Sequence, residues 1–172
     1  MRRLAAVITA GLVFLTSVAP VAAVKPDRGP AVWEPLALPA GTVCEFDVTV
    51  EVSDHNQRMT TFFDRFGNPR TTAVTGHGPL LATNEETGAQ ILIEGGGRQT
   101  FGGDADTFIL TGSGVTGLYF FPGDATPVGV GDGGLYVVKG SFYEELDLNT
   151  NVVTVLEIRG TVIDVCAALA SE

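Results

Sequence analysis

Hydrophobic and polar residues alternate without a break along residues 44–52. Cysteine, phenylalanine and three valines take the even-numbered positions, while three acids and a threonine take the odd-numbered ones. A period of two predicts a β-strand with one face in a core and the other in water. Because a one-residue slip would bury three carboxylates, the same pattern also fixes the register of this strand.

Similar short runs, separated by glycine, proline and asparagine, continue to the end of the chain. Residues 85–88 predict a hairpin loop in which Gly88 takes a positive φ. Gly76 to Pro79 predict a bulge or a sheet edge, and Gly160 a kink. Only residues 166–170 suit a helical turn. The further strands are expected at residues 57–66, 70–84, 89–94, 99–101, 107–111, 118–121, 135–139 and 141–148, and at 152–159, which runs on through the kink to Cys166.

The two cysteines, Cys44 and Cys166, stand near the two ends of this all-β region. In an exported chain two such cysteines are expected to pair. A disulfide requires Cα atoms within about 7 Å of each other, which would bring the first and last strands together. We therefore predict one antiparallel β-barrel of eight to ten short strands, with a β-sandwich as the alternative.

The start of the chain has the composition of a secretory signal peptide. Arg2 and Arg3 precede an uncharged apolar run, and Val21-Ala22-Ala23 supplies small residues for cleavage. We expect residues 1–23 to be the signal, residues 24–40 a proline-rich extended lead-in, and residues 41–172 the all-β domain. The protein is then secreted and has no membrane contact after cleavage.

Acidic residues dominate the composition. The chain carries 20 acidic and ten basic residues, a formal net charge of −10. Cleavage after residue 23 would remove two basic residues and no acid, and so make the charge more negative. Such a charge disfavours nucleic acids and anionic membranes as partners.

Few residues suit catalysis or metal binding. Outside the predicted signal the only histidines are His55 and His77. The sequence also has no zinc-ligand spacing, nucleophile elbow or phosphate loop. We therefore assign no catalytic residue, metal or cofactor. Asp104 and Asp106 lie beside two glycines, which leaves open whether they bind calcium or form a polar hairpin tip.

Three residues are candidates for ligand binding: Tyr119, Phe121 and Glu144. The two aromatics precede a long glycine-rich stretch, residues 122–134, which suits a lid at the mouth of a barrel. Strict alternation along residues 141–148 would point Glu144 inward, where burial would raise its pKa. A bulge near Glu144 and Glu145 would instead turn both acids outward, and this is the outcome we expect.

Three segments resemble a family of proteins: Cys44-Glu45-Phe46-Asp47-Val48, Asn84-Glu85-Glu86-Thr87-Gly88, and Val162-Ile163-Asp164-Val165-Cys166-Ala167-Ala168-Leu169. They are similar to small secreted proteins of high-GC Gram-positive bacteria that have one cysteine at each end of a β-rich domain. The resemblance implies an architecture and assigns no activity.

Three functions fit these observations. We expect a secreted, non-catalytic module that binds a small apolar ligand, a glycan or a surface. An enzyme of the small-barrel type, such as a cyclase or isomerase, is the first alternative, and an inward pocket containing Glu144 would favour it. A structural or interaction protein is the second, and a filled interior would favour that.

Overall fold

A computed structural model describes residues 24–127, 129–130 and 133–171. The predicted signal peptide lies outside the described residues. The described chain is all-β apart from one short helix, which confirms the predicted class. Its elements are β1 (Asp27–Pro30), β2 (Leu36–Leu38), β3 (Val48–Val52), β4 (Arg58–Phe63), β5 (Pro69–His77), β6 (Leu80–Asn84), β7 (Gln90–Ile93), β8 (Gly96–Gly103), β9 (Thr107–Phe120), β10 (Ala125–Thr126), β11 (Gly129–Val130), β12 (Gly134–Asp147), β13 (Val152–Asp164) and α1 (Val165–Ala170).

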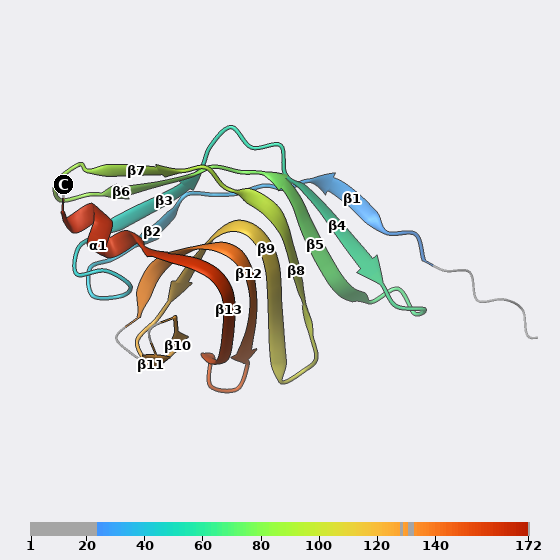
Figure 1. The fold of residues 1–172 in the computed structure, drawn as a ribbon. Helices are drawn as coiled ribbons and strands as arrows, with labels where there is room; N and C mark the ends of the chain where they lie inside the picture. Colours follow the sequence, from blue (N-terminus) through green and yellow to red (C-terminus); the bar gives the residue numbers. More distant parts are fainter. Residues whose placement is uncertain (1–23, 128, 131–132, 172) are drawn as a thin grey trace, which may run out of the picture.

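The strands form two main antiparallel sheets and a small hairpin. Seven strands pair in the order β1-β4-β5-β8-β9-β12-β13, four in the order β2-β3-β6-β7, and β10 pairs with β11. Figure 1 shows β9, β12 and β13 bent into an arch, with the four-stranded sheet above it and the β10–β11 hairpin beneath it. We call the concave side of the seven-stranded sheet the inner face and the convex side the outer face.

The predicted closed barrel is not confirmed. In the described part of the chain each main sheet has two ends, β1 and β13 in one and β2 and β7 in the other. The disulfide between Cys44 and Cys166 is present, with Cα atoms 5.5 Å apart. However, Cys44 precedes β3 and Cys166 lies in α1. The disulfide therefore links the segment before β3 of the four-stranded sheet to the helix that follows β13 of the seven-stranded sheet. The two cysteines are close, as predicted, but the strands beside them do not pair with each other, so their closeness does not close a barrel.

The alternation from residue 44 was only partly a strand signal. Residues 44–46 form bends, Asp47 has no regular structure, and β3 begins at Val48. Cys44 is buried through the disulfide, and Phe46 packs on the same hydrophobic cluster. Cys44 and Phe46 are thus held in the core by an irregular segment, and their spacing of two residues gives the same sequence pattern as a strand.

The proline-rich lead-in contains the short strands β1 and β2. Each forms an edge of its sheet, where a missing N–H is tolerated. The predicted turn at residues 166–170 is confirmed as α1, whose first turn is capped by the Asp164 carboxylate, which accepts from the Ala167 N–H at 2.9 Å.

The glycine and proline stretches at residues 76–79 and 95–97 mark crossings between the sheets rather than a bulge. The chain leaves the seven-stranded sheet after β5 and returns to it at β8. At this corner the Gly78 N–H donates to the Gly95 carbonyl at 3.1 Å. A Cβ at Gly95 would lie 2.4 Å from the Gly78 carbonyl oxygen, so the two backbones can approach this closely only without a side chain.

A row of five paired glycines crosses the seven-stranded sheet. Gly76, Gly97, Gly114, Gly140 and Gly160 lie opposite one another on β5, β8, β9, β12 and β13, and all have φ between 113° and 153°. At four of them, those of β8, β9, β12 and β13, an added Cβ would lie 2.0–2.2 Å from a carbonyl oxygen of the neighbouring strand. We call this feature the glycine row. It allows the strands to bend within the sheet, so the predicted breaks around Gly140 and Gly160 are continuous strands.

Two hydrophobic cores lie on opposite sides of the arch. Leu135 and Val137 of β12 point to the outer face and pack with the four-stranded sheet and Leu169 of α1. Val138 and Phe142 of the same strand point to the inner face. Alternation along one 14-residue strand therefore supplies both cores.

Candidate functional site

The inner face holds a carboxylate among apolar side chains. On β12, Glu144 lies between Phe142 and Leu146 in the alternation, and it pairs with Leu110 of β9 and Leu156 of β13. All four apolar neighbours belong to the inner-face core or pack against it. Glu144 thus follows strict alternation, and the expectation that a bulge turns it outward was wrong. A register shift does occur, but it falls after Glu145 in the pairing with β13, while the pairing of β12 with β9 stays regular.

The β10–β11 hairpin brings a second acid to this face. Asp124 is 4% exposed, and its carboxylate accepts from the Phe121 N–H at 2.7 Å and from the Val153 N–H at 2.8 Å. The first bond closes the turn before the hairpin, and the second fastens the start of the hairpin to β13. The sequence offers little sign of this role, because aspartate after Pro122-Gly123 is common in ordinary turns.

Glu144 is consequently an unusual acid. Burial raises its pKa from 4.5 to about 7, and the negative charge of Asp124 adds to the increase. In the described part of the chain we find no hydrogen bond or ion pair to its carboxylate. Near neutral pH it exchanges a proton easily, and it can accept a hydrogen bond or a positive charge from a ligand.

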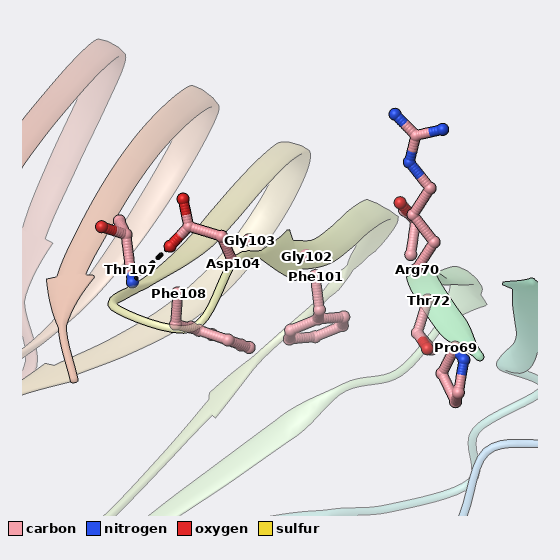
Figure 2. Close-up of a pocket in the computed structure, with 10 residues that line it drawn as sticks. Pro69, Arg70, Thr72, Phe101, Gly102, Gly103, Asp104, Thr107 and Phe108 are labelled. Carbon is pink, nitrogen blue, oxygen red and sulfur yellow. Dashed lines mark hydrogen bonds between the residues drawn. The ribbon is translucent and has the colours of Figure 1, made fainter. Parts of the chain in front are cut away.

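Apolar surface continues from Glu144 across the neighbouring strands. Leu110 pairs with Phe101 of β8, and Phe101 pairs with Thr72 of β5. The rings of Phe101 and Phe108 lie 6.2 Å apart, at the edge of a shallow depression of about 270 Å³. Figure 2 shows both rings and Thr72 on one side of the strands, with the Arg70 side chain pointing to the other side. The inner face therefore joins a half-buried aromatic surface to Glu144.

The structure separates the other two candidate residues from Glu144. Tyr119 and Phe121 are 48% and 42% exposed and form an edge-to-face ring pair at 5.8 Å. Tyr119 pairs with Leu135, nine residues along β12 from Glu144, and both point to the outer face. Of the four residues 118–121, Leu118 and Phe120 are buried, so the segment has one buried and one exposed face.

The predicted lid is a hairpin that covers part of the inner face. Ala125 packs against the core formed by Leu118, Phe120 and Tyr136, and Asp124 and Thr126 are buried with it. This end of the inner face is therefore filled. Beyond it, the inner-face side chains of Glu144, Leu110 and Phe101 are only partly buried.

The histidines and the aspartate pair lie elsewhere. His77 is exposed, and its Nε2 lies 3.4 Å from the Glu94 carboxylate at the corner between the sheets. His55, in the loop between β3 and β4, has a buried Nδ1 without a hydrogen-bond partner in the described structure. Asp104 accepts from the N–H groups of Asp106 and Thr107, which makes it the cap of a hairpin turn. Over the described ranges, no three His, Cys, Asp or Glu residues gather as a metal site would require.

Over residues 24–127, 129–130 and 133–171, no helix is long and apolar enough to cross a membrane. Comparison with models of known protein families, with curated proteins and with solved structures finds no match to the chain.

Proposed function

We propose that the protein is a secreted, non-catalytic module that binds a small apolar molecule on its inner face. The ligand carries a basic or hydrogen-bond-donating group that meets Glu144. The observation that carries this proposal is an inner-face carboxylate surrounded by Leu110, Phe142, Leu146 and Leu156, with no partner among the described residues.

The energetics support this assignment. Burying a carboxylate without a partner costs free energy, and the raised pKa of Glu144 reflects that cost. A ligand that donates to Glu144 recovers part of the cost, while its apolar body covers Leu110 and the Phe101–Phe108 pair. Binding surfaces commonly combine apolar walls with a few placed polar groups. The inner face needs no closed barrel for this, because the arched sheet is concave by itself.

Export is part of the same proposal. It is supported by the signal-like composition of residues 1–23 and by the disulfide of Cys44 and Cys166, which suits an oxidising compartment. Membership of the group of small secreted β-rich proteins, with one cysteine at each end of the domain, belongs to this proposal as well.

The test compares two fluorescent probes with the same dansyl group and alkyl chain, one ending in an amine and the other in a carboxylate. We expect the amine probe to bind more tightly, and Glu144→Gln to remove this preference. Glu157→Gln, an exposed acid on the outer face of β13, is the control and should leave the preference intact. Equal binding of both probes by the wild-type protein would exclude Glu144 as the contact. If neither probe binds, the structural or interaction role takes the place of the binding module.

A proton-transfer enzyme is the second candidate, since a carboxyl group with a pKa of about 7 suits general acid–base catalysis. We rank it second because no described residue bonds to Glu144 and orients it. Turnover of a bound ligand that is lost in Glu144→Gln while binding persists would favour the enzyme.

A further inference from the structure

A line of arginine and hydroxyl side chains crosses the outer face. Direct pairing joins one residue from each of six adjacent strands, β4, β5, β8, β9, β12 and β13, and directly paired residues share a face. All six side chains are exposed. We call this line the arginine row; its members are Arg58, Thr75, Arg98, Ser113, Ser141 and Arg159.

The arginine row follows the bend of the sheet. Thr75, Arg98, Ser113, Ser141 and Arg159 are each next in sequence to a member of the glycine row. Since neighbouring residues of a strand point to opposite faces, the glycines lie inside the bend and the arginine row lies along its outer crest. Side chains on a convex crest diverge from their neighbours and are open to a ligand that runs across the strands.

The charge on this crest opposes that of the whole protein. The chain has a net charge of −10, yet Arg58, Arg98 and Arg159 form no ion pair within the described residues. Lys139 and Arg28 point to the same face from adjoining positions. Near the row, two acids point to this face from β12 and β13: Glu145 accepts from the Tyr143 hydroxyl, and Glu157 lies two residues from Arg159 without forming an ion pair with it in the described structure. The crest is thus a basic stripe on an acidic protein.

The spacing of the arginines indicates the type of anion. Strands lie about 4.8 Å apart, so Arg58 and Arg98 stand about 10 Å apart, Arg98 and Arg159 about 14 Å apart, and the row is about 24 Å long. Double-stranded DNA carries a charge every ~1.7 Å of its axis, far denser than these arginines. The row also contains no aromatic residue on which a base could stack. Serine and threonine hydroxyls between the arginines instead suit a chain of hydroxyl groups with widely spaced charges.

We infer that the arginine row binds an extended anionic polysaccharide that lies along the outer crest. Its carboxylate groups contact Arg58, Arg98 and Arg159, and its hydroxyl groups bond to Thr75, Ser113 and Ser141 between them. Arginine suits this role because its planar guanidinium pairs with a carboxylate through two hydrogen bonds. This site is on the opposite face from Glu144 and is independent of the ligand proposed there.

The test measures retention of the full protein on immobilised polygalacturonate, with neutral dextran and single-stranded DNA as comparison ligands. The row variant is Arg58→Gln/Arg98→Gln/Arg159→Gln. The control variant, Lys25→Gln/Arg65→Gln/Arg70→Gln, removes three exposed positive charges that lie off the row. Circular dichroism verifies that both variants fold.

We expect the row variant to bind polygalacturonate roughly tenfold more weakly and the control variant to bind it within about twofold of wild type. The salt dependence of binding should also become shallower only in the row variant. Equal losses in both variants, no wild-type binding at low salt, or equal binding to dextran would overturn the inference. Tighter binding to single-stranded DNA than to polygalacturonate would overturn the choice of polysaccharide.

Discussion

Replacing Glu144 with glutamine should stabilise the protein at neutral and higher pH. The pKa of Glu144 is about 7 in the folded protein, against 4.5 for an ordinary glutamate. The folded state therefore holds its proton more tightly than the unfolded state does. Below pH 4.5 both states are protonated, and ionisation costs no stability. As the pH rises from 4.5 to about 7, ionisation favours the unfolded state and the free energy of unfolding falls.

The size of this effect follows from the shift. A difference of 2.5 pKa units, at about 1.36 kcal/mol for each unit, corresponds to about 3.4 kcal/mol as an upper bound. Glu144 is only partly buried, and solvent screening reduces this to about 2 kcal/mol. Glutamine keeps the shape of protonated glutamate but cannot ionise. The variant should match wild type below pH 4.5 and exceed it by about 2 kcal/mol above pH 7.

Urea unfolding at a series of pH values measures this difference directly. Titrations that wild type and variant share cancel when the two free energies are subtracted. Glu157→Gln serves as the charge-matched control, since it removes an exposed acid on the strand next to β12. If the difference between Glu144→Gln and wild type is constant from about pH 4 to about pH 9, Glu144 is not a buried acid and the site loses its basis.

Three other features of the structure can be tested in the same way. Cys44→Ser should lower the free energy of unfolding by roughly 2–5 kcal/mol, and reduction of the wild-type disulfide should have a similar effect in urea unfolding. Gly114→Ala should cost about 3 kcal/mol or prevent folding, because its Cβ would lie 2.2 Å from the Gly96 carbonyl oxygen; Gly29→Ala, in open space, is the control and should be nearly neutral. Hydrogen bonds from the backbone N–H groups of Asn68, Asp106 and Asn149 lower the pKa of Asp64, Asp104 and Asp147. Their contribution to stability is present above pH 3.8 and is lost as the pH falls below it, so wild type should lose more stability on acidification than Asp64→Asn/Asp104→Asn/Asp147→Asn; equal losses would contradict this.

The sequence predicted local features better than long-range ones. Alternation placed most strands and turns, because these depend on neighbours in the chain. It also offered the inward orientation of Glu144, although we expected a bulge to turn this acid outward. Arg58, Arg98 and Arg159 gave no signal, since only the pairing of six strands brings them into one line. For the same reason Gly140 and Gly160 looked like interruptions. Gly140 and Gly160 pair with each other, so the strands bend there together and remain continuous. In the sequence of one strand alone, the same glycine looks like the end of the strand.

The glycine row also has a consequence for how the chain tolerates insertions and deletions. Gly97, Gly114, Gly140 and Gly160 must all come opposite one another, since a side chain at any of these positions would strike a neighbouring carbonyl. If one residue is removed between two paired glycines of a hairpin, only one arm becomes shorter. Either the two glycines then no longer lie opposite each other, or the turn that joins the arms must change its conformation. Hairpins β8–β9 and β12–β13 should accept length changes only when both arms change equally, which keeps the glycines opposed, and by two residues each, which keeps every side chain on its face. The glycine row thus fixes the lengths of the paired strand segments on each side of it relative to one another.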